Sequence, residues 1–397
     1  MITIEEAWEF IENHIRLNES DVVPVDCSVG RVVSEPITCE FDSPPFDKSL
    51  VDGYAVSEMD VSNATCTVVE TVVAGEVAKV ALEQGGATRI MTGCPLPKGS
   101  VGVVMVEETV DLEDGRVRIQ AENFQASQNV LQRGKVIRAG QELISQNQRL
   151  RPHDVGALCE FGIQNVQVFK HSSIAVLATG NELVDSATTP AAGQIRNSNG
   201  PMLVELVKAV GGQAWNLGIG PDLKNELNQK IKEGLQQQVL LIAGGVSAGI
   251  MDLVPQCLKE NGVKEIFHKV DLKPGKPLWF GRAESGTLVF GLPGNPISSL
   301  VCFKLFVEPL IKRQSGQNGG FLPFENGVLK SDLRFKGNRT TFWPCQAKRL
   351  QGRIEVLPLD WKGSADQATY CQANALIRLD GPPNRVQAGD VVSLIWL

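Results

Sequence analysis

Between about residues 173 and 316 the sequence alternates short apolar runs with amphipathic stretches, and glycine-rich turns follow the apolar runs. The apolar runs have the length and composition of buried strands, and the stretches between them have the apolar spacing of helices. Strands that alternate with helices in this way form a parallel sheet that is covered on both faces. We therefore predict a doubly wound, mostly parallel α/β domain. Its strands are expected at residues 173–179, 213–219, 239–245 and 287–291, and its helices at residues 200–212, 222–237, 251–262 and 295–314.

The rest of the chain is predicted to be mainly β, with two short helices. The first helix begins after Thr3, whose hydroxyl can form a capping box with Glu6. Residues 66–119 are rich in Val and Thr, with a hairpin signal at Asp114 and Gly115. A second helix is expected at residues 152–161, with Gly162 past its end, and we expect it to pack against the first. The last 77 residues, from about residue 321, contain three more expected strands, at residues 352–359, 374–379 and 391–397.

Length, charge and cysteine content exclude several classes of protein. A chain of 397 residues is too long for one core, so several domains are expected. The net charge of −7, without a run of Lys and Arg, disfavours nucleic-acid binding. No signal peptide or membrane-spanning stretch is recognisable. The nine cysteines form no CxxC pair, so we expect reduced thiols and a cytoplasmic protein without zinc or disulfides.

Polar and glycine-rich turns follow the four expected strands of the α/β domain. In such sheets, ligands bind beyond the carboxyl ends of the strands, where helix N-termini offer free N–H groups to an anion. A single turn of this kind is most simply a strand terminator, but four at one edge favour a phosphate or oxyanion site. The residues in these turns are Thr179, Gly180 and Glu182, then Asp222, then Gly244, Gly245 and Ser247, and finally Pro293, Gly294 and Asn295.

Three lysines add positive charge near the last of these turns. Lys269, Lys273 and Lys276 bracket a tight PGKP turn and could bind phosphate or another oxyanion as point charges. The alternative is that they are solvated surface lysines. Their place next to the GLPGNP segment favours the site.

Four carboxylates are candidate ligands for a hard cation such as Mg²⁺, which prefers oxygen. They are Asp52, Glu182, Asp222 and Asp252. Asp222 and Asp252 could instead cap the helices that follow them.

Several segments resemble those of the MoeA family. FDKSLVDGYAV looks like the family's FDxSxMDGYA motif, and RIMTGCPLP looks like its RIMTGAPxP motif. LATGNELV, GQIRNSN, GGVSAG, LKPGKP and GLPGNP follow in the family's order over essentially the whole chain. The resemblance implies a discontinuous linker domain, a β-rich second domain, the α/β domain and a small C-terminal β-barrel. Their expected bounds are residues 1–44 with 137–170, residues 45–136, residues 171–316 and residues 317–397.

The resemblance also implies a function in molybdenum cofactor biosynthesis. Such a protein is a molybdopterin molybdenumtransferase, which inserts molybdate into adenylylated molybdopterin and releases AMP with the help of Mg²⁺. It is expected to be a homodimer, to receive its substrate from a molybdopterin adenylyltransferase and to serve proteins that mature molybdoenzymes.

Site residues carry over motif by motif. Ser247 and Asp252 would bind or help to cleave the substrate, and the three lysines would hold its phosphates or the oxyanion. Asp52 and Thr92 would approach from the second subunit. The remaining expected cleft residues are Glu182, Asp222, Pro293 and Pro296 of the α/β domain, and Arg339 and Ser364 of the C-terminal domain.

The chain departs from the family's pattern at several positions, most of them acidic in the family. Asn181 replaces an Asp, Ile250 replaces an acid, and Lys135 and Val136 replace two more; Val51 replaces a Met. Two alternatives therefore stay open beside the transferase. One is a divergent paralogue or scaffold with a weakened metal site, and the other is a molybdopterin adenylyltransferase.

Overall fold

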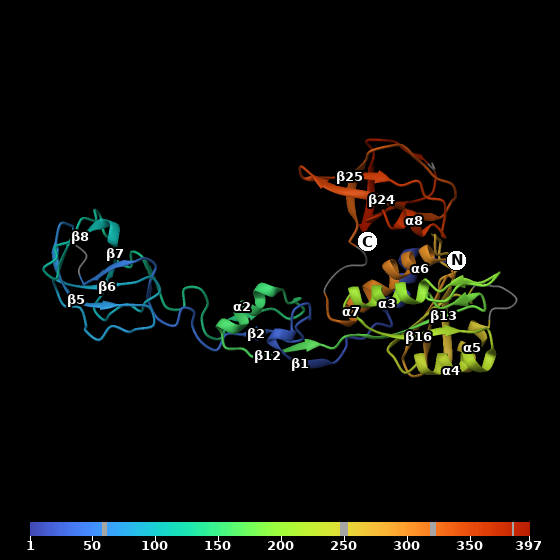
Figure 1. The fold of residues 1–397 in the computed structure, drawn as a ribbon, viewed down its shortest axis with the longest axis horizontal. Coiled ribbons are helices and arrows are strands. Elements are labelled where there is room, and N and C mark those ends of the chain that lie inside the picture. The colour runs from blue at the N-terminus through green and yellow to red at the C-terminus, as the bar shows by residue number, and fades with distance from the viewer. Residues whose placement is uncertain (58–61, 247–252, 318–322, 383–384) are drawn as a thin grey trace.

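The computed structural model describes residues 1–57, 62–246, 253–317, 323–382 and 385–397. Figure 1 shows an elongated chain, with a β-rich domain at one end and the α/β domain at the other. A small linker domain that contains α2 lies between them, and the C-terminal domain lies beside the α/β domain. In the described part of the chain, no helix combines the length and the apolar character that a membrane crossing requires.

The α/β domain is built on a six-stranded sheet in the order β16-β13-β17-β21-β20-β18. Its first four strands are parallel and confirm the prediction: β13 (Ser173–Thr179), β16 (Gln213–Gly220), β17 (Val239–Ala243) and β21 (Leu288–Leu292). The sequence did not predict β18 (Val263–His268) and β20 (Trp279–Ala283), which extend the sheet with antiparallel pairs. The sheet is therefore mostly parallel, as expected.

Helices cover both faces of this sheet, because successive residues of each strand point to opposite sides. In β13, Ile174 and Val176 pack under α3, α6 and α7, whereas Ala175 and Leu177 pack under α4 and α5. The doubly wound prediction is thereby confirmed. The bounds are α3 (Asn199–Ala209), α4 (Lys224–Gly234), α5 (Val254–Glu260), α6 (Pro296–Cys302), a π-helical turn (Phe303–Val307) and α7 (Glu308–Gln314).

The first helix, α1 (Ile4–Glu12), begins with the predicted capping box. The Glu6 amide donates to Thr3 Oγ1 at 3.1 Å, and the Thr3 amide donates to Glu6 Oε2 at 2.8 Å. Its apolar face packs into the α/β core with Phe280, not against α2 (Pro152–Glu160). The expected packing of these two helices is therefore wrong. Burying the apolar face of α1 in the larger core leaves α2 to pack elsewhere.

The linker domain is built from two stretches that are far apart in the sequence. Its core contains Val25 and Val33 from the first stretch and Leu158 of α2 from the second. Two antiparallel pairs join the stretches: β1 (Ser20–Pro24) pairs with β12 (Asn165–Phe169), and β2 (Ile37–Thr38) pairs with β11 (Glu142–Ile144). The 3₁₀ turn η1 (Val25–Cys27) lies beside α2.

The β-rich domain contains a six-stranded sheet in the order β7-β4-β6-β5-β9-β8. The hairpin predicted at Asp114 and Gly115 is confirmed, because β8 and β9 pair antiparallel on either side of it. Its elements are β4 (Gly53–Val56), β5 (Thr65–Val72), β6 (Gly86–Ile90), β7 (Gly102–Met105), η2 (Val106–Glu108), β8 (Thr109–Asp111) and β9 (Arg116–Ile119), with the small pair β3 (Lys48–Ser49) and β10 (Val130–Leu131).

The C-terminal domain is a closed five-stranded barrel, as the resemblance implied. Its strands follow the order β24-β25-β22-β28-β26, and a pairing between β26 and β24 closes it. The bounds are β22 (Glu325–Leu329), β24 (Thr340–Leu350), β25 (Arg353–Pro358), β26 (Ala375–Leu379) and β28 (Val391–Trp396), with the pair β23 (Leu333–Arg334) and β27 (Arg385–Val386) and the short helix α8 (Gln367–Tyr370).

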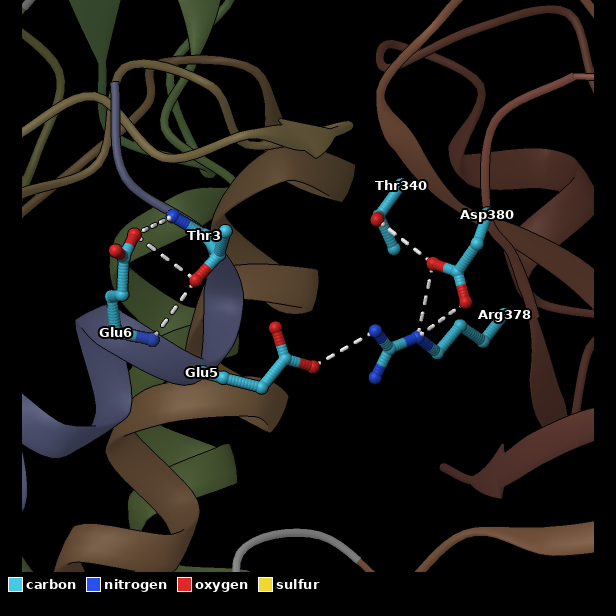
Figure 2. A network of polar contacts seen from close by, with 6 residues as sticks. All are labelled: Thr3, Glu5, Glu6, Thr340, Arg378 and Asp380. Atoms are coloured by element: carbon cyan, nitrogen blue, oxygen red, sulfur yellow. Dashed lines mark hydrogen bonds and ion pairs between the residues drawn. The ribbon is translucent and has the colours of Figure 1, made fainter.

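Several direct contacts attach the barrel to the α/β domain, and two of them involve β24 and β26 of the barrel. The short strand β19 (Leu272–Lys273) leaves the α/β domain and pairs in parallel with β24 of the barrel. Figure 2 shows the second connection, in which Arg378 of β26 pairs with Glu5 of α1 at 2.8 Å and with Asp380 at 3.0 Å. Thr340 also donates to Asp380, at 2.8 Å. These contacts hold the barrel against the α/β domain.

Candidate functional site

Two adjoining cavities lie at the carboxyl ends of the parallel strands. The larger, of about 970 Å³, lies between the α/β domain and the barrel. The smaller, of about 290 Å³, lies over the ends of β13 and β17. Five residues line both cavities, so the two form one continuous site: Glu182, Ile195, Pro277, Pro293 and Gly294. This is the edge of the sheet where the sequence predicted a ligand site.

The larger cavity is strongly cationic, although the chain as a whole is acidic. Glu182 is the one carboxylate among the described residues that line it. The cations come from both domains: Lys273 and Lys276 from the α/β domain, and Arg334, Lys336, Arg339 and Lys362 from the C-terminal domain. Because these cations line one cavity, the cavity favours a multiply charged anion.

Hydrogen bonds between the two domains hold several predicted residues in place. Lys273 Nζ donates to the Lys336 carbonyl at 2.9 Å, and Arg339 Nη1 donates to the Leu272 carbonyl at 3.0 Å. A third contact joins Asn295 Nδ2 to Ser364 Oγ at 2.9 Å. The predicted residues of the α/β domain and of the barrel thus meet across one cavity.

The turn after β17 lies directly against the end of β13. Gly244 and Gly245 have φ angles of +100° and +66°, which side chains with a Cβ rarely adopt. A Cβ on Gly244 would lie 2.5 Å from the Thr179 carbonyl oxygen, and one on Gly245 would lie 2.9 Å from Thr179 Oγ1. The two glycines therefore allow the backbone to line the smaller cavity closely.

Oxygen atoms dominate the polar wall of the smaller cavity. Glu182 and Asp222 line it together with Thr179 and Asn199. Thr179 Oγ1 and Asn199 Oδ1 are buried without a hydrogen-bond partner among the described residues. Such unpartnered oxygens are costly unless a ligand supplies the missing contact. This set of hard donors fits Mg²⁺, although no cluster of three or more metal-ligating side chains occurs within the described ranges.

Asp222 contacts Asn181 and does not cap the helix that follows. The Asn181 amide donates to Asp222 Oδ2 at 3.3 Å, and the Asp222 amide donates to Asn181 Oδ1 at 2.9 Å. The N-cap of α4 is Leu223, which has no capping side-chain hydrogen bond. Asp222 therefore does not cap α4, and it lines the smaller cavity.

Four predicted residues of the α/β domain are not placed at either cavity. Ser247 and Asp252 lie outside the described residues, as does the departure at Ile250. Lys269 has a φ of +73°, and its carbonyl accepts from the Ile2 amide at 3.3 Å, but its side chain lines neither cavity. Pro296 is the first residue of α6 and also lines neither.

Asp52 and Thr92 lie together in the β-rich domain. The Thr92 amide and hydroxyl donate to Asp52 Oδ1 at 2.7 and 2.8 Å. These hydrogen bonds stabilise the carboxylate and lower the pKa of Asp52 below its ordinary value. The β-rich domain lies at the opposite end of the same chain from the α/β domain and its cavities (Figure 1). Nearby, Val51 packs against the core of the β-rich domain, whereas Val136 is 68% exposed.

Sequence reasoning missed the aromatic wall of the larger cavity. Phe335, Trp343 and Trp361 line it beside the barrel cations. Both indole N–H groups are satisfied within the protein, by the carbonyls of Leu359 at 2.8 Å and Gly363 at 2.6 Å. Arg334, Lys336 and Lys362 were missed as well. The predicted neighbours Arg339 and Ser364 are the only local signal that could have drawn attention to them.

Comparisons with known proteins agree with this architecture. Residues 2–162 match the MoeA N-terminal region (domain I and II), residues 175–313 match the probable molybdopterin binding domain, and residues 326–397 match the MoeA C-terminal region (domain IV).

Similar proteins cover almost the whole chain. A molybdopterin molybdenumtransferase of Staphylococcus aureus (strain Mu50 / ATCC 700699) is 31% identical, over 99% of this chain and 95% of its own. One of Staphylococcus epidermidis (strain ATCC 12228 / FDA PCI 1200) is 29% identical over the same shares. The crystal structure of the molybdopterin biosynthesis moea protein from Pyrococcus horikosii covers 100% of this chain and 99% of its own, with 29% identity and a TM-score of 0.86.

Proposed function

The chain belongs to the MoeA family and acts in molybdenum cofactor biosynthesis, and from this premise we propose that it is a molybdopterin molybdenumtransferase. The proposed reaction inserts molybdate into adenylylated molybdopterin and releases AMP. The observation that carries this proposal is the cationic cavity between the α/β domain and the barrel. Both substrates are anions, and this cavity is where the described residues concentrate positive charge.

The cations would act on the bond that breaks. Release of AMP cleaves the phosphoanhydride of the substrate: a water oxygen forms the new P–O bond, and negative charge grows on the departing phosphate. Lys273, Lys276 and Arg339 line the cavity from two sides and would stabilise that charge as it forms. The contacts of Lys273 and Arg339 with backbone carbonyls hold both side chains in place before the substrate binds.

The aromatic wall would orient the flat parts of the substrate. The substrate contains a pterin and an adenine, and both rings can stack on an indole. Trp343 and Trp361 lie at this wall with a ring-centroid distance of 5.2 Å and an edge-to-face geometry. Because their N–H groups are already bonded to backbone carbonyls, the contribution of these side chains is a fixed apolar surface.

The smaller cavity would hold Mg²⁺. Glu182, Asp222, Thr179 Oγ1 and Asn199 Oδ1 supply oxygen donors there, and Asp252 is predicted to join them. When bound, the ion would neutralise phosphoryl oxygens. Because Asn181 occupies the position of a family Asp, the site has one negative charge fewer, so we expect weaker Mg²⁺ binding. Magnesium titration by calorimetry should give lower affinity for Glu182→Gln and higher affinity for Asn181→Asp.

A second copy of the chain would complete the site. Asp52 and Thr92 belong to the β-rich domain, which lies at the opposite end of the chain from the α/β domain (Figure 1), so a role at the cavity requires another subunit. We therefore propose a homodimer in which each β-rich domain faces the cavity of its partner. The Asp52 carboxylate, kept ionised by the Thr92 hydrogen bonds, would add a negative charge beside the metal.

The chemistry of the substrate defines its neighbours in the pathway. An adenylylated substrate requires an adenylyltransferase that acts on molybdopterin, and the cofactor product requires proteins that deliver it to molybdoenzymes. The nine cysteines are all free, which supports the cytoplasm as the proposed location.

An assay of AMP release tests the proposed function. The protein is incubated with adenylylated molybdopterin, Mg²⁺ and molybdate, and AMP and molybdenum cofactor are measured. We expect molybdate-dependent release of AMP, and a loss of about a hundredfold in rate for Lys276→Gln. Lys348→Gln, at an exposed position of β24, is the matched control and should keep the full rate.

Two other outcomes would overturn the proposal. Consumption of ATP with unmodified molybdopterin would identify an adenylyltransferase. A protein of intact fold that produces neither AMP nor cofactor would indicate a scaffold or an inactive paralogue.

A further inference from the structure

A third cavity, of about 420 Å³, lies at the opposite edge of the α/β sheet. It is formed where the segments that precede β17 and β21 meet the segment after α1 and the end of α7. None of its lining residues lines either cavity of the proposed active site. Its volume is within the range of about 300–1,000 Å³ that small-molecule sites occupy.

The lining of this cavity is basic and contains no carboxylate among the described residues. Arg16 follows α1, and Arg282 is a half-buried residue of β20. Neither guanidinium group has a hydrogen bond or an ion pair with a residue of the described ranges, whereas many other arginine side chains pair with Asp or Glu. Two arginines without partners at one cavity leave several donors available to an anion.

An acceptor without a partner lies at the same cavity. Gln314, at the end of α7, is 5% exposed, and its Oε1 is buried without a hydrogen-bond partner among the described residues. Neighbouring polar groups are already engaged, since Gln238 Nε2 donates to Asn18 Oδ1 at 2.9 Å and Thr287 Oγ1 donates to the Leu235 carbonyl at 2.9 Å. A ligand that supplies an N–H or O–H group would remove the cost of this unpaired oxygen.

His14 lies at the cavity in a fixed orientation. Its Nδ1 lies 2.7 Å from the Phe10 carbonyl oxygen, and its ring packs edge-on against Phe280. Because Nδ1–H can donate to that carbonyl, Nε2 stays available as a second polar group of the site.

We propose that this cavity is a second ligand site, separate from the active site, for a small phosphate ester that also carries hydrogen-bond donors. The phosphate would bind Arg16 and Arg282, and an amino or hydroxyl group of the ligand would donate to Gln314. A simple ion would leave most of the volume and the Gln314 oxygen unused, which is why we infer an organic phosphate. A ligand here contacts both the start of the parallel strands and the segment that leads into the linker domain, so the site is placed to regulate the enzyme.

Protection of arginines from chemical modification tests the site directly. The full chain is treated with phenylglyoxal in the presence of AMP, adenosine or inorganic phosphate, and labelling of each arginine is followed by peptide mass spectrometry. With AMP at ten times its dissociation constant, about one-tenth of the sites stay free, so labelling of Arg16 and Arg282 should slow about tenfold. Adenosine should protect neither arginine, because it lacks the phosphate.

Variants separate this cavity from the active site. In Arg16→Gln, the AMP concentration that half-protects Arg282 from labelling should rise by about ten- to a hundredfold. In Gln314→Leu, this half-protecting concentration should rise more for AMP than for inorganic phosphate. Lys276→Gln, in the active-site cavity, should leave the protection unchanged. Arg353→Gln, at an exposed position of the barrel, is the matched control for the loss of one arginine. Unfolding temperatures verify that each variant is folded.

Two results would overturn the inference. One is labelling of Arg282 that does not respond to AMP in the folded wild-type protein. The other is protection that persists in Arg16→Gln but is lost in Lys276→Gln, since this would assign the effect to the active-site cavity.

Discussion

Two inactive variants of this protein should restore activity to each other when they form a mixed dimer. Lys276 lines the cavity between the α/β domain and the barrel, whereas Asp52 lies in the β-rich domain at the other end of the same chain (Figure 1). In the proposed homodimer, each active site takes Lys276 from one chain and Asp52 from the other. A dimer of one Asp52→Asn chain and one Lys276→Gln chain therefore contains one site with both substitutions and one site with neither.

The size of the recovery follows from this geometry. Each pure variant should lose about a hundredfold or more of the AMP-release rate, because Lys276→Gln removes a positive charge at the departing phosphate and Asp52→Asn removes a negative charge beside the proposed metal. The mixed dimer should recover about half of the wild-type rate per dimer, since one of its two sites is intact. Chains with two different affinity tags are co-expressed, the mixed dimer is purified over both columns, and AMP release is measured against both pure variants.

The same experiment can refute the reasoning. If Asp52 and Lys276 served one site within a single chain, both sites of the mixed dimer would carry one substitution, and activity would stay at the level of the pure variants. A mixed dimer that carries both substitutions on one chain, with a wild-type partner, is the matched control. In the shared-site geometry it has a defect in each site and stays inactive, although it contains the same substitutions.

Three further predictions concern the fold and its ionisable groups. Thr3→Ala removes the hydroxyl that caps α1, so the free energy of unfolding should fall by about 1 kcal/mol in urea denaturation; an unchanged midpoint would contradict the capping box seen here. Thr92→Val removes a donor that lowers the pKa of Asp52, so this pKa should rise toward 3.8 in a carbon-13 NMR titration, and the carboxylate should become protonated at a higher pH than in the wild type; an unshifted titration would show that the hydroxyl is not the cause. In the folded protein, iodoacetamide should label the three exposed cysteines and spare the buried ones, among them Cys345, whose pKa burial raises to about 12; rapid labelling of Cys345 below the unfolding transition would contradict its position in the barrel core. The exposed thiols are Cys27, Cys159 and Cys371.

The sequence alone was sufficient to predict those elements that are marked by a pattern among neighbouring residues. The parallel strands β13, β16, β17 and β21 were predictable because each is a short apolar run that ends in a turn. The capping box of α1 was predictable because its two residues are three positions apart. The antiparallel strands β18 and β20 were missed, although β20 and β21 form a hairpin around Ser285 and Gly286, whose turn signal was available in the sequence.

The amino-acid sequence by itself determined the alternating strands and helices of the α/β domain, the glycine-rich turns at one sheet edge and the lysines of the PGKP turn. Only the tertiary structure decided which surfaces meet. It placed α1 in the α/β core, brought Lys336 of the C-terminal domain to Lys273 across 63 positions of sequence, and put Asp52 at the far end of the chain. The physical reason is that periodicity and turn chemistry act between near neighbours, whereas a cavity wall depends on packing and hydrogen bonds between segments that the sequence keeps far apart.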